Sequence, residues 1–208
     1  MIRKNARPLG AGRSLYSAFT RNCRAVCRLS RSELLKEALL RKLTELSPED
    51  GARLMAVYRE SNGENAAWFA PDAPTPEEGL RRTEAGFLTW LREDFLSKKE
   101  NTLWVWEEDG IFLSALRLTE LDGFLWLEAL ETRPDRRGQG CGERLLRALA
   151  AELSQAGGAC VRSCVSKKNR PSLALHQKVG FTVERDPGWD FGTGEEDAGS
   201  FGMLRRIP

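Results

Sequence analysis

The 208-residue sequence is long enough for one globular domain with a short extension. Hydrophobic residues make up 41% and charged residues 30%, which is typical of a soluble protein with a packed core. No apolar run approaches the roughly 18 residues that a membrane helix needs, and residues 1–31 lack the apolar block of a secretory signal. We therefore expect neither a transmembrane segment nor a secretion signal.

Charge is distributed unevenly along the chain. Residues 1–31 carry eight arginine or lysine side chains and no acid; because the whole chain has a net charge of +2, residues 32–208 carry −6. We divide the chain into a basic extension, residues 1–38, and a domain, residues 39–208. Three interpretations of the extension stay open: a disordered or helical tail, an arm that contacts nucleic acid or the ribosome, and an organelle transit peptide.

The five cysteines do not indicate a disulfide framework, because their number is odd and the chain is long. Cys160 and Cys164 lie on an expected strand, where four residues span about 13 Å, too far for two ligands of one zinc ion. His176 is the only histidine. We expect a cytoplasmic protein without a metal site.

Hydrophobic periodicity and turn residues predict alternating strands and helices. Asp109-Gly110 and Asp122-Gly123 are hairpin signals, so the strands around them form an antiparallel meander. Hairpins combined with helical crossovers predict an α/β (α+β) fold, in which helices flank a mixed, mostly antiparallel sheet of about seven strands in the order β-α-α-β-β-β-α-β-α-β-β. The expected elements are a helix over 32–39, a strand over 40–46, helices over 47–60 and 76–97 separated by a loop over 61–76, strands over 102–107, 111–119 and 124–132, a helix over 143–155, a strand over 159–165, a helix over 169–179, and strands over 181–184 and 200–206 separated by a loop over 185–199.

The segment Arg133-Pro-Asp-Arg-Arg-Gly-Gln-Gly-Cys-Gly142 carries the strongest chemical signal. Its three alternate glycines let backbone N–H groups converge at the positive end of the next helix, which indicates a phosphate or pyrophosphate cradle. It is no Walker loop, because Gly142 is followed by Glu143, and the next strand lacks the terminal acid of a dinucleotide fold. A glycine-rich turn without a ligand is the alternative.

Two motifs carry a family resemblance. Arg137-Gly-Gln-Gly-Cys-Gly142 resembles the coenzyme A signature of the GNAT superfamily of N-acyltransferases, Arg/Gln-x-x-Gly-x-Gly/Ala. Asn169-Arg-Pro-Ser-Leu-Ala-Leu-His-Gln-Lys-Val-Gly-Phe181 is similar to a second family segment, and the two are separated by one helix and one strand, as in the family. The resemblance covers roughly residues 40–207 and does not include the basic extension.

The resemblance implies an acyltransferase that moves acetyl from acetyl-coenzyme A to a primary amine by direct attack, with the non-catalytic coenzyme-binding module as the alternative. It places the pyrophosphate on the glycine loop and the pantetheine arm beside the preceding strand. The residues then expected to bind the coenzyme are Leu130, Glu131, Thr132, Arg136, Arg137, Gly138, Gln139, Gly140, Cys141, Gly142, Asn169 and Ser172, with Lys167, Lys168 and Arg170 as further candidates for its phosphates.

Direct attack needs a group that takes a proton from the ammonium ion. Glu128 and Glu131 are the candidates on the strand before the loop, and their odd spacing predicts that they point to opposite faces. We favour Glu128, on a face shared with Phe124, Trp126, Leu130 and Thr132, although the usual family position falls on Trp126. A glutamate that holds the acceptor amine or pairs with an arginine is the alternative.

His176 stands where many family members have the tyrosine that reprotonates the leaving thiolate. Histidine can act as this acid, and a packing role is the alternative.

The acceptor is an amine of a small molecule or a protein, and the protein is expected to be a monomer or homodimer that does not bind a membrane. The acceptor site is expected between the first two helices, the loop over 61–76 and the loop over 185–199. Its expected walls are Trp68, Phe69, Trp90, Trp189 and Phe191, and its expected acids are Glu64, Asp72, Glu77, Glu78 and Asp190. A nucleic-acid-binding protein led by the basic extension is a further alternative.

Overall fold

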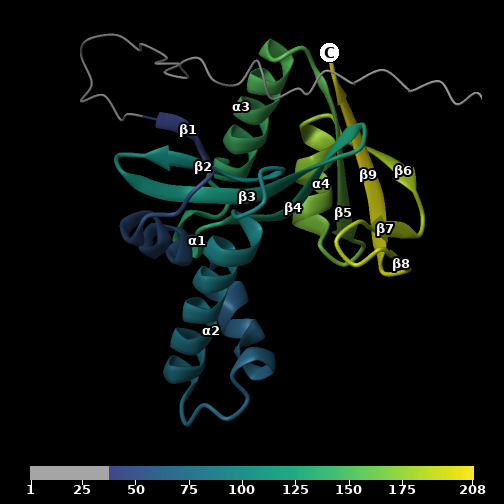
Figure 1. The fold of residues 1–208 in the computed structure, drawn as a ribbon. Coiled ribbons are helices and arrows are strands. Elements are labelled where there is room, and N and C mark those ends of the chain that lie inside the picture. Colours follow the sequence, from purple (N-terminus) through teal and green to yellow (C-terminus); the bar gives the residue numbers. More distant parts are fainter. Residues whose placement is uncertain (1–37) are drawn as a thin grey trace, which may run out of the picture.

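The computed structural model describes residues 38–208, so that nearly all of the basic extension and most of the helix expected over 32–39 lie outside the described residues. Seven strands form one sheet in the order β1-β2-β3-β4-β5-β9-β6, and a small second sheet pairs β7 with β8 (Figure 1). The strands are β1 (Ala38–Leu43), β2 (Asn101–Glu108), β3 (Ile111–Leu121), β4 (Phe124–Thr132), β5 (Ala159–Ser166), β6 (Thr182–Arg185), β7 (Gly188–Asp190), β8 (Glu195–Asp197) and β9 (Ser200–Ile207). The helices are α1 (Pro48–Phe69), α2 (Pro76–Trp90), α3 (Cys141–Gln155) and α4 (Arg170–Lys178).

The expected fold class is confirmed. Within the described residues, β4 and β5 are parallel, and every other pair of neighbouring strands in the seven-stranded sheet is antiparallel. Helix α1 packs against one face of the sheet and α2 packs against α1, projecting away from the sheet, while α3 and α4 cover the other face (Figure 1).

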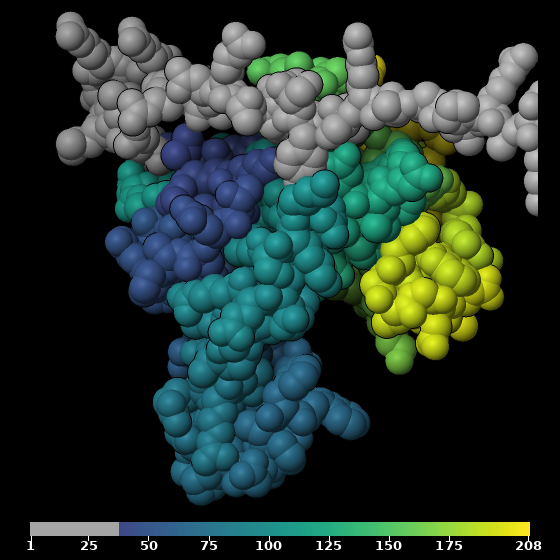
Figure 2. Space-filling model, in the orientation of Figure 1, coloured from purple at the N-terminus to yellow at the C-terminus, as the bar shows by residue number. Residues whose placement is uncertain are grey.

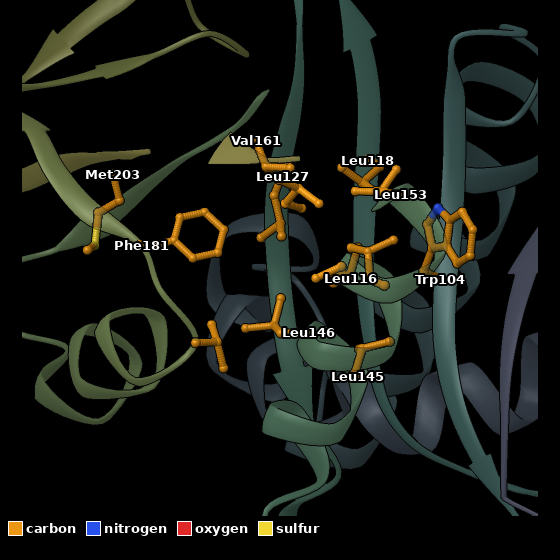
Figure 3. Packing of buried hydrophobic residues seen from close by; sticks show 14 of the residues in the cluster. Trp104, Leu116, Leu118, Leu127, Leu145, Leu146, Leu153, Val161, Phe181 and Met203 are labelled. Carbon is orange, nitrogen blue, oxygen red and sulfur yellow. The ribbon is translucent and has the colours of Figure 1, made fainter. Parts of the chain in front are cut away.

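Each face has its own hydrophobic core. Figure 3 shows the core beneath α3 and α4, in which Leu145 and Leu146 of α3 meet Leu127 of β4 and Val161 of β5. The core beneath α1 is built from Leu54 and other residues of α1, from β1, β2 and β3, and from the turn after α2. The paired part of β4 and β5 is therefore packed by the core beneath α3 and α4, whereas the core beneath α1 packs mainly on β1, β2 and β3.

Helix α1 begins as expected but ends later. Ser47 Oγ accepts a hydrogen bond from the N–H of Asp50 at 3.0 Å, and Pro48 occupies the first turn. The helix continues to Phe69, so the expectation of a loop over 61–69 is wrong. Asn62 is buried within the helix and its amide donates to Met55 Sδ at 3.6 Å, which shows how tertiary packing outweighs a local turn signal.

Three further expectations need correction. Ala38 and Leu39 belong to β1 and are not helical. The single helix expected over 76–97 is interrupted, because α2 ends at Trp90 and a π-helical turn over Leu91–Phe95 follows. The loop expected over 185–199 contains the β7–β8 hairpin, whose strands of three residues are too short to show a periodic pattern.

No helix within residues 38–208 combines the length and the apolar character that crossing a membrane requires.

Candidate active site

A cleft opens where β4 and β5 separate. The two strands are paired only from Leu125 to Leu127 on β4 and from Val161 to Ser163 on β5. Beyond this point β4 stays paired with β3, and β5 stays paired with β9. Among residues 38–208, the edge of β4 that faces β5 therefore has no strand partner from Glu128 onward. A cavity of about 1010 Å³ lies along this edge, bordered by α1, the glycine loop and α4. Figure 2 shows a recess between the α1–α2 hairpin and the lobe formed by β7 and β8.

A β-bulge changes which way the side chains of β4 point. Arg117 of β3 pairs with Glu128, but Ala115 pairs with Glu131, so Ala129 and Leu130 together oppose one residue of β3. Ala129 has a φ of +49°, in the left-handed region that alanine rarely occupies. The bulge adds one residue to β4 and so shifts the alternation of its side chains by one position. Glu128 and Glu131 therefore lie on the same face although three positions separate them.

This corrects the expectation that the two glutamates point apart. Leu130 packs against the core beneath α3, and Thr132 also lies on the α3 side, where its Oγ1 is 3.3 Å from the position of a Cβ built on Gly142. The face expected to join Trp126, Glu128, Leu130 and Thr132 is thus divided by the bulge.

The glycine loop has the backbone of an anion cradle. Gly138 and Gly140 have φ values of +72° and +76°, and Gly140 is the N-cap of α3, so the loop turns directly into the positive end of that helix. A Cβ on Gly138 would meet no atom within 4 Å, which shows that its backbone faces open space. Since the first N–H groups of a helix have no partner within it, the start of α3 can donate to a bound phosphate.

Most of the predicted coenzyme-binding residues border the cleft. Arg136 and Gln139 do not: Arg136 lies beside Asp135 at 3.7 Å, and the amide of Gln139 donates to the Asp135 carbonyl at 3.3 Å. The side chain of Asn169 caps α4, because its Oδ1 accepts from the Ser172 N–H at 3.1 Å. The predicted residues that border the cleft are Glu128, Leu130, Glu131, Thr132, Arg137, Gly138, Gly140, Cys141, Gly142, Asn169, Ser172 and His176.

Glu128 is paired with a partly buried arginine, Arg117. Nε of Arg117 lies 3.0 Å from Oε1 of Glu128, outside hydrogen-bond geometry, so the contact is an ion pair. The Arg117 guanidinium also lies 4.9 Å from the ring centre of Trp90 and 5.6 Å from that of Phe95. On the other side, a Cβ on Gly192 would lie 3.8 Å from Oε2 of Glu128, so the tip of the β7–β8 hairpin covers this carboxylate.

Glu131 has a different environment. Burial raises the pKa of its carboxyl, and the nearby acids Glu60 and Glu64 raise the pKa further, while Ser61 and Arg137 lower it. Glu60 itself is ion-paired with Arg137 of the glycine loop. The two glutamates of β4 thus share a face but differ in electrostatic environment, Glu128 facing a cation and Glu131 facing α1.

His176 is buried beneath the cleft. It is 1% exposed, and its Nδ1 lies 2.8 Å from the backbone oxygen of Ser172. Because a carbonyl only accepts, Nδ1 carries the proton, and the neutral ring has a bare lone pair on Nε2, for which the described residues provide no partner. Burial lowers the pKa of His176, so the neutral ring is favoured. Its ring meets Phe181 edge to face at 5.0 Å.

The structure brings only part of the expected acceptor site together. Glu64 and Asp190 border the cleft, whereas Asp72 and Glu78 pair with Arg82 on α2. Trp189 and Phe191 pack near Trp126, and Trp90 stacks on Phe87 at 5.8 Å. Trp68 and Phe69 are exposed at the end of α1.

Lys167, a candidate for binding the coenzyme phosphates, is instead ion-paired with Asp186 and donates to the Ala198 carbonyl.

Sequence reasoning missed Glu60, Ser61 and Arg117. The first two border the cleft because α1 continues to Phe69, through part of the segment 61–76 that was expected to be a loop. Arg117 carries a recognisable signal, since it lies between Leu116 and Leu118 in a mostly apolar strand. Within residues 38–208, no group of three or more histidine, cysteine or acidic side chains is arranged to hold a metal ion.

The environment of Glu131 predicts a pH-dependent effect on stability. A carboxyl whose pKa is raised by folding favours the folded state at low pH and loses this contribution as the pH rises through the raised value. Glu131→Gln should therefore unfold at a higher temperature than the wild type at pH 7, and the difference should vanish near pH 4. Thermal unfolding followed by circular dichroism at both pH values measures this.

The exposed Glu45→Gln is the matched control, because it removes one carboxylate without changing a buried site. Equal midpoints for Glu131→Gln and the wild type at pH 7 would contradict the assignment of a destabilising charge to Glu131.

Comparisons with known proteins agree with this geometry. The sequence model of the acetyltransferase (GNAT) family matches residues 62–181, more than half of the chain. None of the curated proteins compared with the sequence matches it.

Solved structures show the same fold at low identity. PaiA N-acetyltransferase from Thermoplasma acidophilum, in complex with coenzyme A, has 20% identity and a TM-score of 0.55 over 81% of this chain and 98% of that chain. The ribosomal-protein-S18-alanine N-acetyltransferase from Escherichia coli has 20% identity and a TM-score of 0.51 over 81% and 94%. An N-acetyltransferase from Staphylococcus aureus Mu50 has 20% identity and a TM-score of 0.51 over 82% and 97%. By the match to its sequence model, with the fold in agreement, this chain belongs to the acetyltransferase (GNAT) family.

Proposed function

We propose that this protein transfers the acetyl group of acetyl-coenzyme A to a primary amine by direct attack. The observation that carries the proposal is the open edge of β4, which joins the glycine loop at one end to two carboxylates, Glu128 and Glu131, on a single face. Acetyl-coenzyme A bound along this edge would have its pyrophosphate at the glycine loop. The same cleft would hold a carboxylate that accepts a proton from the attacking amine.

The glycine loop is the proposed site of the pyrophosphate. The backbone N–H groups from Arg137 to Gly142 would donate to its oxygens, and the positive end of α3 would favour its charge. The pantetheine arm, itself a chain of amides, would pair with the unpaired edge of β4 as an added strand. A free N–H of β4 would then polarise the thioester carbonyl as charge develops on its oxygen.

The two glutamates of β4 are proposed to divide the work on the amine. Glu128, fixed by Arg117, binds and orients the incoming ammonium group. Glu131, whose pKa is raised by burial, takes the proton that the ammonium must lose before its nitrogen attacks the carbonyl carbon. This moves the proton-accepting role from Glu128, which the sequence favoured, to Glu131.

The remaining protons complete the balance. As the C–N bond forms and the C–S bond breaks, the nitrogen loses a second proton and the thiolate gains one. We place His176 in this exchange, because its bare Nε2 can take up a proton and pass it to the thiolate. Glu131 then releases its proton to solvent, so the protein ends the cycle in its starting state, with a free thiol, an amide and one released proton as products.

The proposed acceptor is a cationic amine. Six acids border the cleft, and Glu143 among them is paired with Lys178 and Arg147. Ion pairs with Arg117 and Arg137 balance only two of the other five, which are Glu60, Glu64, Glu128, Glu131 and Asp190. Small-molecule amines and protein N-termini share this chemistry, and the Escherichia coli neighbour is named for a protein acceptor.

An acceptor panel tests the proposal. The protein is incubated with acetyl-coenzyme A and monoamines, polyamines, amino acids or peptides with a free N-terminus, and thiol release is followed while mass spectrometry confirms the acetylated product. Amine-dependent thiol release supports the proposed function. Binding of acetyl-coenzyme A without transfer to any amine would favour the non-catalytic module instead.

The division of roles between the two glutamates predicts distinct kinetic effects. Glu131→Gln should lower kcat by about 10²- to 10⁴-fold, the usual contribution of a general base, with partial recovery at high pH as the free amine becomes abundant. Glu128→Gln should mainly raise KM for the amine, since it removes a binding contact. Steady-state kinetics at pH 7 and pH 9.5 measure both, and the reverse pattern would return the base role to Glu128.

A proton-exchanging role of His176 predicts a loss of turnover without a loss of coenzyme binding. His176→Phe keeps an aromatic ring against Phe181 but removes Nε2. Turnover should fall at least tenfold, within the range of general acid–base effects, while the Kd for coenzyme A from calorimetry stays within about twofold. Unchanged turnover would contradict the catalytic role of His176 and favour a role in packing only.

A further inference from the structure

Tyr58 of α1 makes a contact with β4 that the proposed chemistry does not yet use. It is 2% exposed, and its hydroxyl donates to the backbone oxygen of Ala129 at 2.9 Å, across 71 positions of the sequence. Its ring meets Phe87 of α2 edge to face at 5.4 Å, so both helices hold it in place. The side chain therefore links the helical layer to a single peptide group of the sheet.

That peptide group lies in the bulge of β4. Among residues 38–208, Ala129 and Asp109 are the non-glycine residues with positive φ, and Asp109 sits in an ordinary hairpin turn. A left-handed alanine within a strand is strained, and it persists only where its surroundings fix it. The hydrogen bond from Tyr58 is such a constraint, because it satisfies the Ala129 carbonyl where the regular β3–β4 pairing is interrupted.

The bulge determines where Glu131 points. If β4 were regular from Glu128 to Glu131, the two carboxylates would lie on opposite faces, since side chains alternate along a strand. Tyr58 also lies close to the charged groups themselves, because Arg117, Glu128 and Glu131 all act on the pKa of its phenol. Burial is the main cause that raises this pKa, so the phenol keeps its proton and remains a donor.

We propose that Tyr58 is a positioning residue: its hydroxyl fixes the Ala129 bulge and thereby holds Glu128 and Glu131 on the same face of the cleft. The inference rests on the proposed function, in which these two carboxylates act on one amine. Tyr58 touches neither substrate nor reacting atoms in this account, and it acts through the backbone of β4.

The test is Tyr58→Phe, which removes only the hydroxyl and keeps the ring against Phe87. Thr102→Val is the matched control, because it removes another buried hydrogen bond, in which Thr102 Oγ1 accepts from Trp104 Nε1 at 3.0 Å, without bordering the cleft. Hydrogen exchange followed by mass spectrometry reports on the segment 128–132 in both variants, and steady-state kinetics report on turnover. Circular dichroism first confirms that both variants are folded at the assay temperature.

The expected result for Tyr58→Phe is at least tenfold faster exchange in segment 128–132 and a kcat at least tenfold below that of Thr102→Val, with KM for acetyl-coenzyme A changed less than kcat. Exchange in segment 128–132 equal to that of Thr102→Val would overturn the proposal, and so would faster exchange with unchanged kcat. Exchange needs no substrate. If the wild type transferred no acetyl group, the proposed function would fail, whereas the exchange of segment 128–132 would still decide whether Tyr58 fixes the bulge.

Discussion

The separation of β4 from β5 is the constraint on which the rest of the structure depends. Parallel pairing over only three residues leaves β4 with one edge paired to β3 and one edge that, among residues 38–208, has no strand partner and borders the cleft. Backbone N–H and C=O groups that lack partners are costly unless water or a ligand satisfies them. An extended ligand with amide groups of its own complements such an edge, and the glycine loop at its end supplies the complement for phosphate.

The acidic groups of the cleft are placed by packing on both sides of the open edge. Arg117 is held among aromatic rings beneath α2 and faces Glu128, whereas Glu131 faces α1 and has its pKa raised by burial. Two chemically identical side chains on one strand thus have different electrostatic surroundings. In the proposed mechanism this difference lets one carboxylate bind a cation while the other accepts a proton, and the bulge at Ala129 brings both to the same face.

Local sequence signals predicted the parts of the fold whose causes are local. The hairpin turns at Asp109-Gly110 and Asp122-Gly123 and the glycines of the loop each impose a backbone conformation by themselves, and these elements are where the sequence placed them. The helix expected over 143–155 likewise lies within α3 (Cys141–Gln155).

The parts that were missed depend on contacts distant in sequence. Asn62-Gly63 indicates a turn in isolation, yet Asn62 is buried and helical because α1 packs against the rest of the domain. Ala129 gives no signal of a bulge, since alanine is an ordinary strand residue and its unusual φ is fixed by neighbours such as Tyr58, 71 positions away. The expectation that Glu128 and Glu131 point to opposite faces was wrong for this reason.

Thermal unfolding with and without excess acetyl-coenzyme A tests the central claim, that this cleft is a coenzyme site, most directly. A ligand at about 100 times its Kd stabilises the folded state by roughly 2.7 kcal/mol, which corresponds to a shift of about 5–10 °C for a domain of this size. The account predicts such a shift with acetyl-coenzyme A and with coenzyme A, and none with NAD, whose adenosine and pyrophosphate come without a pantetheine arm. The absence of a shift with either coenzyme A species would contradict the account, because neither the glycine loop nor the open edge of β4 would then have the ligand assigned to it.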